Sequence, residues 1–145
     1  MSAARILVVD DEADIRGLVK EILSDEGYDV DVAANAAEAR QARARQEPDL
    51  VLLDIWMPDV DGITLLREWS TSAFDVCPVV MMSGHGTVET AVEATRLGAF
   101  DYVEKPLSLA KLLRTVERAL EAGRKRRVAG RLRANAGAVP VGKSR

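Results

Sequence analysis

Five residues of the kinds that bind metal ions and phosphate lie at the ends of short apolar segments of this sequence. Two acids follow the first apolar segment, one acid ends the third, a hydroxyl ends the fourth and an amine follows the fifth: Asp10, Asp11, Asp54, Ser83 and Lys105. Three carboxylates that converge on one edge repel one another, and a divalent cation such as Mg2+ relieves that repulsion. A carboxylate can also attack phosphorus, while an amine and a hydroxyl bind phosphoryl oxygens. These residue types therefore predict Mg2+-dependent phosphoryl chemistry.

The elements that must position these residues alternate between strand and helix. The expected strands are residues 6–9, 29–33, 51–54, 79–82 and 100–104. Helical periodicity or end signals place helices between residue 12 and Gly27, over 36–46 and 62–70, between Val88 and Gly98, and from Ser108 to Leu120. Five such repeats imply an α/β fold, a doubly wound five-stranded parallel sheet with five helices on its two faces. Right-handed crossovers then bring the ends of all five strands to one edge.

Composition and charge set the domain organisation. The chain has 145 residues, 48% of them apolar and 30% charged, as expected of one globular domain. Residues 123–145 carry eight bases and no acid, so residues 1–122 hold 12 bases against 23 acids, a formal charge of -11. We expect a domain over 1–122 and a basic linker over 123–145, in which 134–138 form loose chain. A nucleic-acid-binding arm is the competing interpretation, but interleaved aromatic residues are missing, so no direct nucleic-acid binding is expected.

Other features exclude some classes of function. No apolar run approaches the roughly 20 residues that span a bilayer, so a cytoplasmic protein without membrane contact is expected. The lone Cys77 precedes Pro78 at the start of an apolar segment and is expected to be a buried, inert thiol. The single His85 between two glycines is a poor metal ligand and indicates a flexible loop. An acidic pair such as Asp10-Asp11 is by itself usually a solvated turn, and only the joint placement at strand ends favours a site.

Four segments that contain these residues resemble the sequence signature of response-regulator receiver domains. They are residues 8–12, 52–62, 82–84 and 104–106, and the resemblance covers about residues 5 to 121. It implies a flavodoxin-like fold with strand order 2-1-3-4-5. It also implies that Asp54 accepts a phosphoryl group from the phosphohistidine of a sensor histidine kinase. Asp11 and Asp54 would bind Mg2+, with Asp10 assisting and the backbone carbonyl of Trp56 completing the protein ligands.

The same resemblance implies the residues that bind the phosphoryl group and respond to it. Ser83 and Lys105 would bind its oxygens, and the Lys105–Pro106 peptide bond is expected to be cis, a state that only X-Pro bonds reach cheaply. Ser83, Tyr102 and Pro106 are the expected switch residues, with Ser83 moving toward the phosphate and Tyr102 turning inward. Phosphorylation would thereby bias an existing two-state equilibrium.

Three further segments indicate a subgroup of receiver domains. The sequences of residues 84–92, 98–101 and 112–120 resemble those of receivers of the nitrogen-regulation (NtrC/NtrX) type. Such receivers precede an AAA+ ATPase module that activates sigma-54 and a DNA-binding module. The resemblance therefore implies a transcription regulator whose oligomeric state or activity is switched, with a homodimer formed through residues 86–122.

Two other classes of function remain as alternatives. Haloacid-dehalogenase-type phosphatases also use an aspartyl phosphate, Mg2+ and a lysine, but they need a second Asp two residues after the nucleophile. Trp56 occupies that position, so turnover of external phosphate esters is not expected, and the protein is interpreted as a switch rather than an enzyme. A stand-alone or degenerate receiver that acts as an interaction module is the second alternative.

Overall fold

Five parallel strands form the centre of the molecule, in the order β2-β1-β3-β4-β5. The computed structural model describes residues 3–70, 77–84 and 88–138. The strands are β1 (Arg5–Val9), β2 (Asp29–Ala33), β3 (Leu50–Asp54), β4 (Val79–Ser83) and β5 (Asp101–Glu104). The helices are α1 (Ala13–Asp25), α2 (Ala36–Arg45), α3 (Gly62–Ser70), α4 (Val88–Arg96) and α5 (Leu109–Ala138). This arrangement confirms the predicted α/β fold and strand order.

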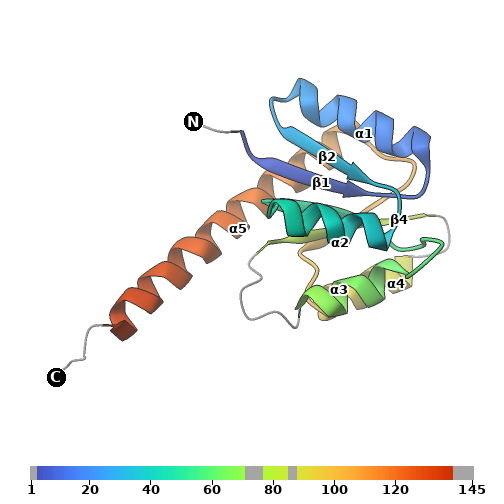
Figure 1. Cartoon of the computed structure of the whole chain (residues 1–145). Coiled ribbons are helices and arrows are strands. Elements are labelled where there is room, and N and C mark those ends of the chain that lie inside the picture. The colour runs from blue at the N-terminus through green and yellow to red at the C-terminus, as the bar shows by residue number, and fades with distance from the viewer. Residues whose placement is uncertain (1–2, 71–76, 85–87, 139–145) are drawn as a thin grey trace.

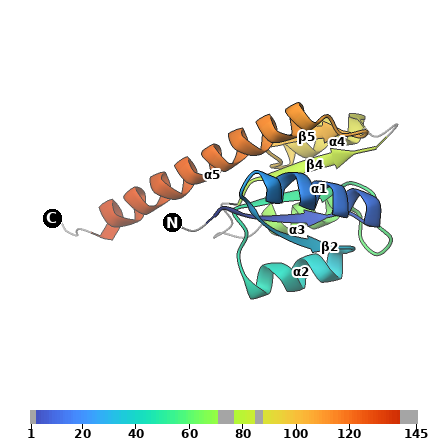
Figure 2. The ribbon, with the colours of Figure 1, turned by 90° about the horizontal axis from the view of Figure 1, so that it is seen from above.

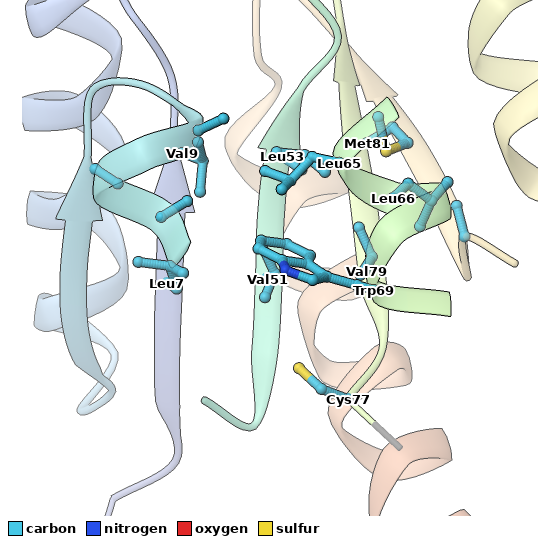
Figure 3. Packing of buried hydrophobic residues seen from close by; sticks show 14 of the residues in the cluster. Leu7, Val9, Val51, Leu53, Leu65, Leu66, Trp69, Cys77, Val79 and Met81 are labelled. Carbon is cyan, nitrogen blue, oxygen red and sulfur yellow. The ribbon is translucent and has the colours of Figure 1, made fainter. Parts of the chain in front are cut away.

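Two hydrophobic layers cover the two faces of the sheet, with α2 and α5 on opposite sides (Figure 2). On one face, α2, α3 and α4 contribute alanines, leucines and Trp69; on the other, α1 and α5 contribute mainly leucines and valines. Figure 3 shows Leu65 of α3 beside Leu53 of the sheet, and Trp69 beside Val51. Because β3 is covered on both sides, all five of its residues are buried, and Asp54 is delivered to the edge from the core.

Local signals in the sequence set most helix ends. Gly27 and Gly98 follow α1 and α4 with φ of +93° and +117°, a backbone region that glycine enters at little cost. The Ser108 hydroxyl accepts a hydrogen bond from the Lys111 N–H at 3.4 Å and caps α5, as predicted. The helical spacing of apolar residues in α1 includes Leu18, but this side chain is not buried, because the residue is 47% exposed.

The prediction of a loose linker over residues 134–138 was wrong, because α5 continues to Ala138 and projects far beyond the sheet (Figure 1). Alanine and arginine dominate residues 122–138, and their high helix propensity outweighs the three glycines there. The expected boundary at residue 123 therefore falls within one continuous helix. Within the described residues, no helix is both long and apolar enough to cross a membrane. Cys77 is buried as expected, and His85 lies outside the described residues.

Candidate functional site

The predicted site residues lie along the edge of the sheet where its strands end. Asp10 directly follows β1, Asp54 and Ser83 end β3 and β4, and Lys105 directly follows β5. The register places Asp54 opposite Met82, and the backbone carbonyl of Ser83 accepts a hydrogen bond from the Lys105 N–H at 2.8 Å. Parallel strands with short right-handed connections therefore bring together groups that are far apart in the sequence.

Lys105 connects the acids of this edge. Its Nζ lies 2.7 Å from Asp10 Oδ2, 3.2 Å from Glu12 Oε1 and 3.5 Å from Asp54 Oδ1. The Lys105 side chain is 13% exposed, whereas that of Glu12 is 60% exposed. Burial alone would lower the pKa of Lys105, but the hydrogen bond that it donates to Asp10 and the charges of Asp54 and Asp10 raise that pKa overall. Lys105 is therefore a fixed positive charge at the mouth of the site.

Asp10 is the deepest of the acids, with no exposed surface. Its Oδ1 accepts a hydrogen bond from the Glu12 N–H at 2.8 Å, and its backbone carbonyl accepts one from the Arg16 guanidinium at 2.7 Å. A buried carboxylate is stable only when it is paired in this way. The turn after β1 is consequently held from two directions, which fixes the position of the acidic pair.

Asp54 carries the strongest electrostatic perturbation among the acids of the site. Burial, the charges of Asp10 and Asp11 and a hydrogen bond with Asp11 raise its pKa, which reaches about 7 instead of 3.8. Lys105 acts in the opposite sense but only partly offsets it. Asp54 as a residue is 4% exposed. Without a metal ion, the acids of the site carry more negative charge than the one paired lysine, Lys105, balances.

The donor set fits a divalent cation. Oxygens of Asp10, Asp11 and Glu12 lie within 4.8 Å of one another, and Asp11 contacts Asp54. Hard cations prefer several carboxylate oxygens. The pKa of Asp54 is raised first by burial and then by repulsion from Asp10 and Asp11, and a bound cation would relieve that repulsion. Among the described residues, Lys105 is the only cation that forms ion pairs with these acids. Glu12 was not predicted as a member of this cluster, because its neighbours Asp10 and Asp11 already explained the motif.

Ser83 has a buried hydroxyl at the end of β4. The residue has no exposed surface, and its Oγ has no hydrogen-bond partner in the part of the chain that the structure describes. An unpaired buried hydroxyl costs about 1–3 kcal/mol, so such groups usually have a role. Its place at the end of β4, beside the β3 strand that carries Asp54, matches the predicted phosphate-binding position.

The two ends of the loop that follows Asp54 lie against each other, with Gly62 packed on the backbone of Asp54 and Ile55. The Gly62 N–H donates a hydrogen bond to the Ile55 carbonyl at 2.7 Å. A Cβ atom on Gly62 would lie 2.1 Å from the backbone oxygen of Asp54, so only glycine fits there. Trp56, within this loop, has a side chain that is 58% exposed.

The remaining predicted switch residues lie on and after β5. Tyr102 is half-buried and packs against the cluster on the α2, α3 and α4 side of the sheet. The Lys105–Pro106 bond is cis, as predicted, and Pro106 is exposed. The expected dimer surface includes α4, β5 and the first part of α5, where the Arg118 guanidinium donates a hydrogen bond to Asp101 at 2.6 Å.

The fold is a doubly wound α/β domain with acids and a lysine at one edge of its parallel sheet, and comparison with known proteins identifies the family. A sequence model of the response regulator receiver domain matches residues 6–117. The chain belongs to the response regulator receiver domain family.

Similar proteins indicate the subgroup. The chain is 48% identical over 124 residues to the nitrogen assimilation regulatory protein NtrX of Azorhizobium caulinodans, covering 84% of this chain and 27% of that protein. It is 44% identical over 123 residues to a putative NtrX-like response regulator of Rickettsia bellii, covering 83% and 26%. The crystal structure of the receiver domain of NtrX from Brucella abortus has a TM-score of 0.76 and 51% identity, covering 80% of this chain and 98% of that one. The chain thus spans about a quarter of the length of the curated relatives it matches.

Proposed function

We propose that Asp54 accepts a phosphoryl group from the phosphohistidine of a sensor histidine kinase, and that this switches the state of an attached transcription activator. The observation that carries the proposal is the convergence on Asp54 of Lys105, 3.5 Å away, and of Asp11, in hydrogen-bond contact. In the reaction a carboxylate oxygen of Asp54 forms a bond to phosphorus while the bond between phosphorus and the histidine nitrogen breaks.

The acids bind the metal ion in this proposal, and Lys105 binds the phosphoryl group. Asp11, Asp54 and Asp10, with the backbone carbonyl of Trp56, would hold Mg2+, and the metal supplies charge neutralisation for phosphoryl oxygens. Lys105 Nζ, already oriented by Asp10 at 2.7 Å, binds a phosphoryl oxygen, and the unpaired Ser83 hydroxyl donates a hydrogen bond to another. Glu12 must then give up its contact with Lys105, because an anionic phosphoryl group competes for the same ammonium.

The response involves Ser83, Tyr102 and Pro106 and the surface formed by residues 86–122. Ser83 gains a partner when the phosphoryl group arrives, and the half-buried Tyr102 on the adjacent strand turns inward. A ligand that hydrogen-bonds better to one of two conformations shifts their populations toward that one. The change would alter contacts between two copies of the chain.

The whole protein is proposed to be a cytoplasmic regulator. Residues 1–122 form the receiver domain, and residues 123–145 lead toward an AAA+ module that activates sigma-54 and a DNA-binding module. The NtrX name of similar proteins and their roughly fourfold greater length support this organisation. The alternative of a stand-alone or degenerate receiver is disfavoured by the complete set of Asp10, Asp11, Asp54 and Lys105 around one point.

Acetyl phosphate and beryllofluoride, each with Mg2+, test the proposed switch. We expect one phosphoryl group per chain, located on Asp54 by mass spectrometry, and a changed elution volume in size-exclusion chromatography with beryllofluoride. Turnover of p-nitrophenyl phosphate is not expected, because Trp56 stands where a phosphatase needs its acid. Phosphate on another residue would contradict the assignment of Asp54, and no response to beryllofluoride would favour the degenerate receiver.

Mg2+ binding is predicted to weaken as the pH falls from 8 to 6. The pKa of Asp54 is raised to about 7 by burial and by its acidic neighbours, so Mg2+ must displace a proton at the lower pH. A single competing proton with this pKa makes the apparent dissociation constant about tenfold larger at pH 6 than at pH 8. Titration followed by the fluorescence of the exposed Trp56 measures this change. Calorimetry in two buffers should show close to one proton released per Mg2+ at pH 6, and equal affinity at both values would refute the competition.

A further inference from the structure

The loop between β3 and α3 is tied to the start of α2 by one side chain. Asp59 Oδ1 accepts a hydrogen bond from the Ala36 N–H, and Oδ2 accepts one from the Ala37 N–H, both at 3.1 Å. Its Oδ1 also accepts from the Val60 N–H at 2.8 Å. The Ala36 hydrogen bond, with the other backbone N–H groups, lowers the pKa of Asp59, which is therefore ionised at neutral pH. Residues 23 positions apart in the sequence are thus joined at the first turn of a helix.

α2 also has a local cap. Asn35 Oδ1 accepts a hydrogen bond from the Glu38 N–H at 2.9 Å, and Glu38 Oε1 accepts one from the Ala34 N–H at 2.8 Å. This reciprocal pair is similar to a capping box, with Glu38 reaching the N–H of Ala34, just before the N-cap Asn35. Asp59 adds to this local cap by accepting from the Ala36 and Ala37 N–H groups, which Asn35 and Glu38 do not reach. Unlike the contacts of Asn35 and Glu38, the contacts of Asp59 connect α2 to the loop between β3 and α3.

The loop itself carries the group expected to complete the metal site. The hydrogen bond from Gly62 to Ile55 closes its two ends, and Asp61 Oδ1 accepts from the Thr64 N–H at 2.8 Å to start α3. Met57 and Val60 pack against the hydrophobic cluster below. Among the hydrogen bonds of the described residues, those of Asp59 are the ones that join this loop to α2. Trp56 lies between the closed end and this anchor.

We propose that Asp59 is a positioning residue for the Mg2+ site, because it anchors the loop that carries Trp56 to the N-terminus of α2. The proposal rests on the proposed function, in which the Trp56 carbonyl is a metal ligand. Asp59 touches neither the metal nor the phosphoryl group in this scheme. It acts through the loop backbone, as partners of metal ligands commonly do.

Mg2+ affinity measured in three variants tests this role. Asp59→Ala removes the anchor, Asp59→Asn keeps one acceptor oxygen, and Asn35→Ala weakens the same helix start without touching the loop. We expect about a tenfold larger dissociation constant for Asp59→Ala, an intermediate value for Asp59→Asn and less than a twofold change for Asn35→Ala. The titrations are done at about 0.5 M salt, where attraction between exposed charges and the cation is screened.

Hydrogen exchange gives a readout that does not depend on the metal. Without Mg2+, amides of residues 56–60 should exchange faster in Asp59→Ala than in the unchanged protein, while Asn35→Ala should leave them unaffected. Equal effects of Asp59→Ala and Asn35→Ala on affinity and exchange would overturn the proposal, because Asp59 would then only stabilise α2. Failure of the unchanged protein to bind Mg2+ would instead refute the proposed function. If Asp59→Ala does not fold, Asp59→Asn compared with Asn35→Ala decides between the same outcomes.

Discussion

Replacing Asp54 by asparagine will abolish phosphorylation by acetyl phosphate and, without Mg2+, will raise the free energy of unfolding at pH 8. Asparagine has nearly the same shape as aspartate but carries no charge, so the repulsion from Asp10 and Asp11 disappears. Each unit of pKa shift corresponds to about 1.4 kcal/mol. After allowance for solvent screening, we expect the variant to be more stable by about 1–3 kcal/mol.

The pH dependence of this gain follows from the direction of the shift. Burial and acidic neighbours raise the pKa of Asp54 from 3.8 to about 7, so the folded protein holds the proton more tightly than the unfolded chain. The contribution of Asp54 to stability is therefore full below about pH 4 and is lost as the pH rises through 7. The advantage of Asp54→Asn should be small at pH 5 and largest above pH 8.

Urea unfolding at several pH values, with and without Mg2+, measures these differences. Asp14→Asn is the matched control, because Asp14 is an exposed acid of α1 and should change stability by no more than about 0.5 kcal/mol. Mg2+ should stabilise the unchanged protein and the control, but have much less effect on Asp54→Asn. A variant that is less stable than the unchanged protein at pH 8 would show that the Asp54 charge is better compensated than its surroundings indicate.

Substitution of Gly62 by alanine is expected to be among the most destabilising changes in the chain. The added Cβ would lie 2.1 Å from the Asp54 carbonyl oxygen, and this neighbour is backbone that cannot rotate away. The end of β3 or the start of α3 must move, at a cost of about 2–4 kcal/mol by analogy with overpacked cores. Because the displaced atoms belong to Asp54, phosphorylation by acetyl phosphate should also slow by about tenfold or more.

Gly17→Ala provides the same chemical change in a different setting. Gly17 is exposed in the interior of α1, and a Cβ there meets no atom within 4 Å. Alanine should therefore stabilise the protein by about 0.5–1 kcal/mol through helix propensity. Thermal or urea unfolding of the two variants should give shifts of opposite sign. Similar small effects at both positions would mean that the loop after Asp54 adapts without cost.

The residues of the site were predictable because each marks the end of a periodic element. A strand buried on both sides is a continuous aliphatic run, so the first polar residue after it must lie at the edge of the sheet. Asp10, Asp54 and Ser83 could be placed in this way, whereas Lys105 follows the more polar edge strand β5; the structure brings all four to one edge. The parallel sheet followed from the regular alternation of strands and helices, whereas its strand order was implied by the resemblance to receiver domains.

Contacts between segments distant in sequence could not be predicted in this way. Glu12 meets Lys105 across 93 positions and Asp59 meets Ala36 across 23, and neither residue lies in a pattern that names its partner. Gly62 was recognisable as part of a motif, but its approach to Asp54 depends on the path of the intervening loop. Residues 134–138 were predicted as loose chain, whereas the alanines and arginines of this region sustain the helix to Ala138.

The unbroken course of α5 has a mechanical consequence for any module attached after it. Thirty residues of helix extend about 45 Å and behave as a stiff rod over that distance. Since one end of the rod packs on β5, a rotation of the helix about its own axis would also turn its far end. The direction in which that end faces changes by about 100° for each residue of helix. The length of α5 therefore determines the direction in which its last turn faces.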